Sequence, residues 1–86
     1  MTAEEALRAA ALAGRLGQFD VTSHCLQRMR TRNVTRRDIR CALQTATTAT
    51  HQEASKWRLD GGVDDDGEPL DLVVVLLGRT LVVTVF

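Results

Sequence analysis

The spacing of hydrophobic positions changes near the middle of the chain. In the first half, apolar residues recur every three or four positions, which is typical of helices packed on one side. In the second half, apolar and β-branched residues alternate with charged ones or form nearly continuous runs, which is typical of strands. Helices followed by strands indicate an α+β fold. The predicted helices span 2–16, 22–32 and 35–46, and the predicted strands span 56–59, 70–77 and 80–86.

Short polar motifs mark the ends of these helices. Ser, Thr and acidic side chains cap helix starts because they accept hydrogen bonds from free backbone N–H groups. Glycine and asparagine tolerate the left-handed conformation in which many helices end. The start signals are Thr2 with Glu5, Thr22 or Ser23, and Thr35 with Asp38, and the stop signals are Gly17 and Asn33.

Short connections join the predicted strands into an antiparallel meander. Residues 61–69 are rich in Gly, Asp and Pro, and Gly78-Arg79 is a two-residue hairpin signal. The run 70–77 is apolar on both faces, so its strand belongs in the centre of the sheet. A further edge strand can form around His51. We therefore expect two to three N-terminal helices covering one face of a C-terminal antiparallel meander of three to four strands.

Length and composition predict a single domain over residues 1–86. Of these residues 44% are hydrophobic, which is enough for a core that needs no disulfide bonds or structural metal ions. Only 3% are aromatic. Cys25 and Cys41 fall in predicted helices, where free buried thiols are common, and this favours a reducing compartment. No signal-peptide pattern is recognisable, and the longest apolar stretch, 72–77, is far too short to span a bilayer. We expect a cytoplasmic protein without membrane contact.

Charge is distributed unevenly along a chain whose formal net charge is zero. Residues 1–59 carry a net +5 and residues 60–86 a net −5, and six arginines lie between positions 28 and 40. Guanidinium groups stay charged and bind phosphate or carboxylate through a bidentate fork, so this cluster suggests an anion-binding surface. A solvated helix face is the alternative, because local charge clusters are common on soluble domains.

Helical spacing divides these arginines into groups. His24, Arg28 and Arg32 stand at i, i+4 and i+8, which aligns one imidazole and two guanidiniums along one flank of their helix. Arg36 and Arg40 share an edge of the next helix, and if the two helices pack side by side they present one basic surface for a phosphodiester backbone. Alternatively, Arg28 and Arg32 pair with the acidic half of their own chain.

One histidine and two strand cations are further candidates for binding or chemistry. Histidine titrates near neutrality, so His24 could act as a base, or could instead hydrogen-bond locally at the start of its helix. Lys56 and Arg58 lie on one face of their strand with Trp57 on the other. The two cations would clamp phosphate if their face is open, or would protect an edge strand against aggregation. Trp57 is expected in the core, and His51 is expected to be exposed.

The sequence carries no recognisable metal or cofactor motif. Residues 64–68 are acidic, but an EF-hand register puts Gly62 at the first ligand position and Val73 where a bidentate Glu is needed, so we expect a turn at Asp66-Gly67 instead. The cysteines and histidines lack the paired short spacing of zinc ligands. A glycine-rich phosphate loop and a nucleophilic serine motif are also missing. We therefore expect neither a metal nor a cofactor.

Several separated motifs resemble one small bacterial family, the domain of unknown function 4258. The opening motif consists of His24, Arg28-Met29, Arg32, the Val34-Thr35 cap and Asp38-Ile39. The second half is similar in its 56–59 strand followed by Gly61, its 66–70 turn and its closing 82–86 strand. The resemblance covers residues 19–86 and leaves the helix within 1–17 as an extension.

This resemblance implies a fold like that of the RelE and BrnT toxins of bacterial toxin–antitoxin systems. Those relatives cut messenger RNA with basic and polar residues and without a metal. By analogy the chain is a toxin-like RNA-binding protein or metal-independent endoribonuclease, with RNA and a small acidic antitoxin as partners. The phosphate contacts would come from Arg28, Arg32, Lys56 and Arg58, joined by Arg36 and Arg40 from the charge pattern, with His24 as general acid or base. The alternative is a non-catalytic regulatory module, which docks an acidic protein on its basic helical face and pairs a partner strand with its sheet edge.

Overall fold

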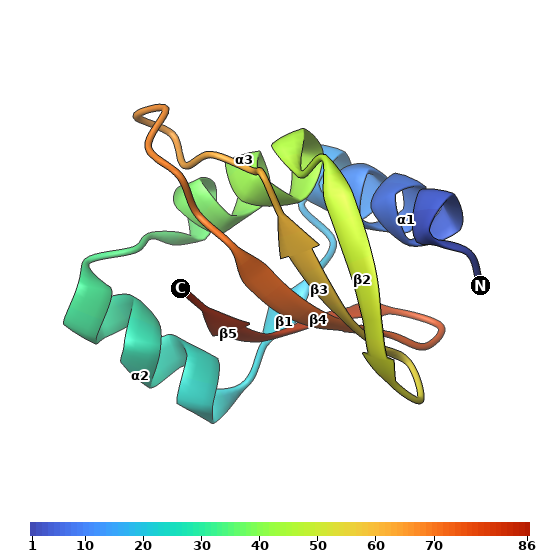
Figure 1. The fold of residues 1–86 in the computed structure, drawn as a ribbon. Coiled ribbons are helices and arrows are strands. Elements are labelled where there is room, and N and C mark those ends of the chain that lie inside the picture. Colours follow the sequence, from blue (N-terminus) through green and yellow to red (C-terminus); the bar gives the residue numbers. More distant parts are fainter.

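Three helices and five strands follow one another along the chain, and the computed structural model describes all residues from 1 to 86 (Figure 1). Every predicted helix and strand is present, which confirms the α+β fold class. The element bounds are α1 (Ala3–Leu16), β1 (Asp20–Val21), α2 (Ser23–Arg32), α3 (Arg36–Thr45), β2 (Thr48–Glu53), β3 (Lys56–Asp60), β4 (Leu72–Leu76) and β5 (Thr80–Val85).

The predicted capping motifs set the helix ends. The hydroxyl of Thr2 accepts from the backbone N–H of Glu5 and the Glu5 carboxylate accepts in return, which is a capping box. Thr35 and Asp38 form the same box at the start of α3. At the other ends, Gly17 closes α1 and Asn33 closes α2, each in the left-handed conformation. These local signals are confirmed to the residue.

The sheet has the order β1-β5-β4-β3-β2, so β4 is central, as its two buried faces predict. Neighbours from β2 to β5 are antiparallel and form the expected meander. One strand differs from the expectation: β1 pairs parallel to β5 and makes the sheet five-stranded and mixed. A strand of two residues is too short to show an alternation of apolar and polar positions. β1 forms because the chain that leaves the end of α1 runs alongside β5.

The helices are unequally placed around the sheet. α1 and α3 pack against each other over one face, and α2 lies beside β5 at one end of the sheet (Figure 1). The core between them includes Ile39 of α3, Trp57 and Val74 of the sheet, and Cys25 of α2, so the predicted burial of Trp57 is confirmed. Both cysteines are free thiols. No helix has the length and hydrophobicity needed to cross a bilayer.

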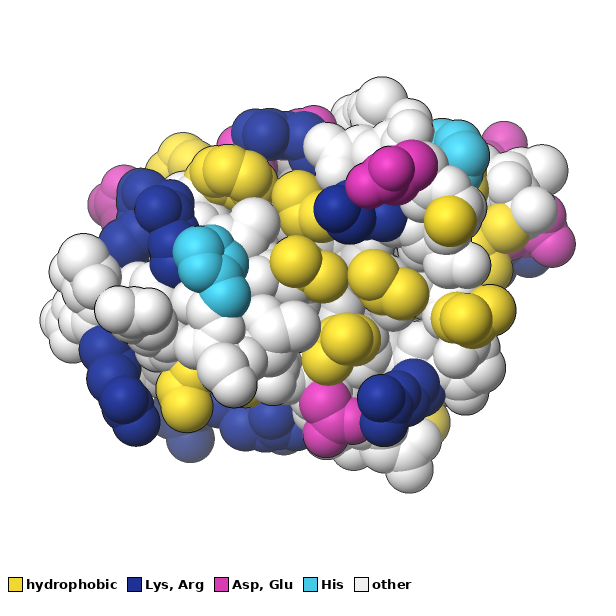
Figure 2. Space-filling model, turned by 90° about the horizontal axis from the view of Figure 1, so that it is seen from below, with side chains coloured by type: hydrophobic (Ala, Val, Ile, Leu, Met, Phe, Trp, Pro, Cys, Tyr) yellow, Lys and Arg dark blue, Asp and Glu magenta, His cyan; other side chains and the backbone are white.

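The opposite face of the sheet is not covered by any helix. Figure 2 shows this face, with hydrophobic side chains gathered in its middle between charged ones. His51 lies on the exposed edge strand β2, and a ring nitrogen lies 2.7 Å from the carbonyl oxygen of Ala54. The predicted exposure of His51 is thus confirmed.

Candidate functional site

One flank of α2 forms a shallow polar hollow of about 270 Å³. Its side chains stand at helical spacing, so they lie one above another along the helix. We call this surface the α2 face. Figure 2 shows basic side chains and a histidine grouped on the α2 side of the molecule. The residues that line the hollow are His24, Gln27, Arg28, Thr31 and Arg32.

The structure thus brings together the three residues that helical spacing aligned, His24, Arg28 and Arg32. Gln27 and Thr31 were missed by the sequence reasoning, which attended only to charge. The same spacing would have found them, because they stand three and seven positions after His24.

Arg28 is anchored to the sheet. Its Nε and Nη2 atoms donate to the carbonyl oxygen of Val85 at 3.3 and 3.2 Å. Because β1 ends at Val21, this carbonyl of β5 has no strand partner, and the guanidinium satisfies it. The hydroxyl of Thr22 does the same for the carbonyl of Val83 at 3.0 Å. Arg28 therefore has a structural role, while its Nη1 atom makes no hydrogen bond and stays free for a ligand.

His24 and Arg32 are exposed, and neither side chain makes a hydrogen bond or an ion pair. The hydrogen bond that fixes the start of α2 comes from Thr22, whose hydroxyl accepts from the backbone N–H of Cys25 at 3.0 Å. The local bond considered for His24 is therefore not formed. No carboxylate orients the imidazole, so His24 lacks the partner that usually prepares a histidine for proton transfer.

The side chains of Arg36 and Arg40 donate hydrogen bonds to backbone carbonyls at the C-terminal end of α1 and in the segment after it. Nη2 of Arg36 donates to the carbonyl oxygens of Gly17 and Phe19 at 3.1 and 2.7 Å, and its guanidinium stacks on the Phe19 ring at 3.9 Å. Nε and Nη2 of Arg40 donate to the carbonyls of Gly14 and Arg15, both at 2.8 Å. The expected surface shared with α2 does not form, because α3 packs along α1 instead.

Lys56 and Arg58 lie on the uncovered face of the sheet, where acidic neighbours hold both. Lys56 Nζ lies 3.3 Å from a Glu53 oxygen. Arg58 Nε donates to Asp60 at 2.8 Å, and the guanidinium lies 3.6 Å from Asp71. The hydrogen bond to Asp60 raises the pKa of Arg58 above its ordinary value. The ion pairing with acidic residues of the same chain that was considered for Arg28 and Arg32 occurs instead at Arg58.

Residues 21–86 match the model of a family described as Domain of unknown function (DUF4258). The chain belongs to this family. The DUF4258 region contains the whole α2 face and leaves α1 outside. No curated protein and no solved structure matches the chain.

The acidic loop of the DUF4258 domain is folded around one aspartate. The Asp64 carboxylate accepts from the backbone N–H groups of Asp66 and Glu68, each at 2.9 Å. Gly67 takes a left-handed φ of 83° as the chain reverses there, at the position where a turn is expected. No group of three or more His, Cys, Asp or Glu side chains is arranged to hold a metal ion.

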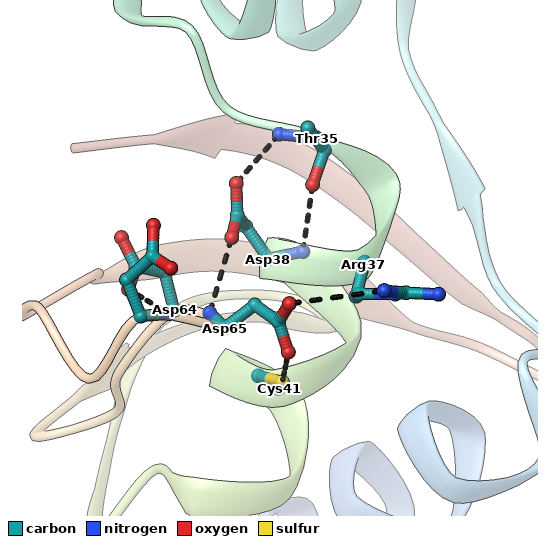
Figure 3. Close-up of polar contacts among 7 residues, drawn as sticks. Thr35, Arg37, Asp38, Cys41, Asp64 and Asp65 are labelled. Atoms are coloured by element: carbon teal, nitrogen blue, oxygen red, sulfur yellow. Dashed lines mark hydrogen bonds and ion pairs between the residues drawn. The ribbon is translucent and has the colours of Figure 1, made fainter.

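The same loop is fastened to the start of α3, as Figure 3 shows. The Asp38 carboxylate accepts from the backbone N–H groups of Thr35 at 2.8 Å and Asp65 at 3.0 Å. The bond from Thr35 is the main cause that lowers the pKa of Asp38. Asp65 in turn accepts from Cys41 Sγ at 3.6 Å and faces Arg37 at 4.0 Å. Burial, and then the Asp65 carboxylate, raise the pKa of Cys41, so this cysteine stays a neutral thiol.

Negative charge also borders one end of the α2 face. Asp65 and Asp66 line a hollow together with Asn33, the residue that ends α2. An anion bound along α2 is therefore attracted between His24 and Arg32 and repelled beyond Asn33.

Proposed function

We propose that the DUF4258 domain binds single-stranded RNA through the α2 face, as a toxin-like RNA-binding protein. The charge of α2 carries this proposal. The helix contains no acidic residue, and no carboxylate pairs with Arg28, Arg30 or Arg32. Guanidiniums without a carboxylate partner on one helix, of which Arg30 and Arg32 are exposed and Arg28 is half-buried, attract a phosphate backbone and release its counterions.

The spacing along α2 supports a strand over a single anion. Arg28 and Arg32 are separated by four residues, or about 6 Å of helix rise, which is comparable to the distance between neighbouring phosphates of a single strand. Gln27 and Thr31 offer hydrogen-bond donors and acceptors in the hollow, as a ribose hydroxyl requires. The α2 face has no aromatic side chain, so we expect affinity to be mainly electrostatic and poor in sequence preference. The choice of RNA over DNA rests on the expectation that this family is similar to toxins that act on messenger RNA.

Binding, and not cleavage, is the activity that the geometry supports. Metal-free cleavage needs one group that takes a proton and another that gives one. Of the side chains that line the hollow, only His24 is of a type that commonly acts as general acid or base, and no carboxylate orients it. The proposal therefore assigns His24 to binding, as a neutral or charged hydrogen-bond donor.

Fluorescence anisotropy with a labelled single-stranded oligouridine tests the proposal. For phosphate contacts from Arg28 and Arg32, the logarithm of the association constant is expected to fall with the logarithm of salt concentration at a slope of about −1.4. Arg32→Gln is expected to weaken binding about fivefold at low salt and to reduce the slope by about 0.7. The matched control is Arg37→Gln, an exposed arginine of α3 outside the hollow, with a change below about twofold.

Several results would count against RNA binding at the α2 face. They are no anisotropy change at low salt, or an equal loss of affinity in the Arg32→Gln and Arg37→Gln variants. Cleavage of the oligonucleotide that disappears in a His24→Ala variant would contradict the assignment of His24 to binding alone.

A second candidate, a protein-interaction module, is favoured by the free edge of β2. This strand pairs only with β3, so its outer backbone groups are open to a partner strand. The irregularity between His51 and Glu53 and the mainly exposed polar side chains of β2 work against such pairing, which makes this candidate the weaker one. A module that uses only β2 would leave the RNA anisotropy unchanged at every salt concentration.

A further inference from the structure

Exposed hydrophobic side chains gather in a groove between α1 and the hairpin that joins β4 to β5. The groove has a volume of about 350 Å³. One wall is a helical stripe of α1, formed by Ala9, Leu12, Ala13 and Leu16. The other wall includes Leu77 at the tip of the hairpin.

This groove concentrates most of the exposed apolar surface. Six large hydrophobic residues of the chain are exposed, and four of them line the groove. Leu12, Leu16 and Leu77 are 48%, 54% and 73% exposed, and the fourth is Met1. Such a continuous apolar surface marks an interaction site. The elements that line it, α1 and the β4–β5 hairpin, lie on the opposite side of the molecule from α2 (Figure 1), so the groove is separate from the proposed RNA site.

The charges of α1 indicate which partner fits. In the first turn Glu4 lies 3.7 Å from Arg8 and Glu5 adds a second carboxylate, so this end keeps a net negative charge, while the exposed Arg15 lies in the last turn without an ion-pair partner. An acidic partner would be repelled at the first turn, and a basic partner at the last. A partner with the reverse order of charges fits both ends, and a second α1 running antiparallel has this order. The chain's formal net charge is zero, so two copies do not repel each other as a whole.

We propose that the chain forms a two-fold symmetric homodimer through antiparallel α1 helices. Setting Leu12 against the partner's Ala9 places a large side chain over a small one, and the two-fold axis repeats this contact. The same alignment sets Arg15 opposite the partner's position 6, within one helical turn of the partner's Glu4 and Glu5. Leu77 extends the contact beyond the helix. The two α2 faces then lie at the outer ends of the dimer, free to bind independently.

Sedimentation equilibrium of the full chain over a concentration series tests this dimer. The mass is expected to rise from the 9.5 kDa of one chain towards twice that value. Leu12→Glu and Leu16→Glu each place a carboxylate in the interface and are expected to weaken dimerisation about 100-fold or more. Leu26→Glu is the matched control, because Leu26 is an exposed leucine of α2 outside the groove, and its mass profile is expected to follow the wild type. Circular dichroism verifies that each variant is folded.

A charge exchange tests the antiparallel arrangement itself. Arg15→Glu alone sets the introduced carboxylate against the partner's Glu4, and Glu4→Arg alone places two arginines together, so each variant is expected to dimerise more weakly than the wild type. An equimolar mixture of the two variants has complementary charges at both contacts and is expected to form a heterodimer. A wild type that remains at 9.5 kDa at all concentrations overturns the dimer, as does equal dissociation by Leu26→Glu and Leu12→Glu. Failure of the mixture to associate overturns the antiparallel arrangement.

Discussion

Arg40 holds the end of α1 to α3, and its replacement by glutamine is expected to destabilise the fold. Its Nε and Nη2 atoms donate to the carbonyls of Gly14 and Arg15 at 2.8 Å. These carbonyls lie in the last turn of α1, where the backbone N–H of Gly17 reaches only that of Gly14, at 3.2 Å. The guanidinium therefore satisfies the free carbonyl of Arg15, gives the carbonyl of Gly14 a second hydrogen bond, and places positive charge at the negative end of the helix dipole.

The expected loss follows from these contacts. A hydrogen bond from a charged donor contributes about 1.5–3 kcal/mol, and a cation at a helix C-terminus adds about 0.3–1 kcal/mol. The bond to Arg15 is exposed, so water replaces it at little cost, and the part-buried bond to Gly14 dominates. Arg40→Gln is thus expected to lower the free energy of unfolding by about 2 kcal/mol. In a domain of this length, that lowers Tm by about 10 °C.

Urea and thermal unfolding followed by circular dichroism measure this effect. Arg37→Gln is the control, since its exposed side chain makes only a 4.0 Å ion pair with Asp65, and its loss is expected to stay below about 0.5 kcal/mol. Arg40→Lys keeps the charge but cannot reach both carbonyls, so it is expected to fall between wild type and Arg40→Gln. If Arg40→Gln unfolds at the same Tm as Arg37→Gln, Arg40 does not anchor α1.

Three further outcomes are expected. Gly14→Ala places a Cβ 2.8 Å from the Arg40 carbonyl oxygen, so urea unfolding should show a loss of about 1–2 kcal/mol even though alanine favours helix. The lowered pKa of Asp38 means that its carboxylate stabilises the fold above the ordinary aspartate pKa of about 3.9 and that this contribution is lost as pH falls through the lower folded value. Asp38→Asn should therefore be less stable than wild type in urea at neutral pH, and the difference should vanish in acid; a pH-independent difference would contradict this. Asp66→Asn removes a negative charge beside the end of α2 and should strengthen RNA binding about twofold by anisotropy, whereas unchanged affinity would place the RNA elsewhere.

The helices could be predicted from the sequence because their signals are local. A capping box such as that of Thr35 and Asp38 joins residues three positions apart, so it can be recognised from the order of residues in the sequence. The central position of β4 could be predicted as well, because burial on both faces leaves a continuous apolar run. The alignment of His24, Arg28 and Arg32 on one flank follows from helix geometry alone.

The partners of the arginines could not be predicted in the same way. Arg28 donates to a carbonyl 57 residues away, and Arg40 to carbonyls 25 and 26 residues away. Backbone carbonyls carry no side-chain signature, so the sequence does not show which of them lack a partner. The parallel pairing of β1 with β5 could not be predicted either, since it depends on where the chain lies after the end of α1.

The role of α1 connects these observations. It lies outside the DUF4258 region, yet two of its alanines, Ala6 and Ala10, are completely buried in the common core. Arg36 and Arg40, which belong to the DUF4258 region, hold its C-terminal carbonyls and those of the segment after it. α1 is therefore an integral layer of the fold, and part of the arginine cluster serves to attach it. What remains for an anion is the cluster's N-terminal part on α2, and for this reason the RNA proposal depends on Arg32 and not on the total positive charge.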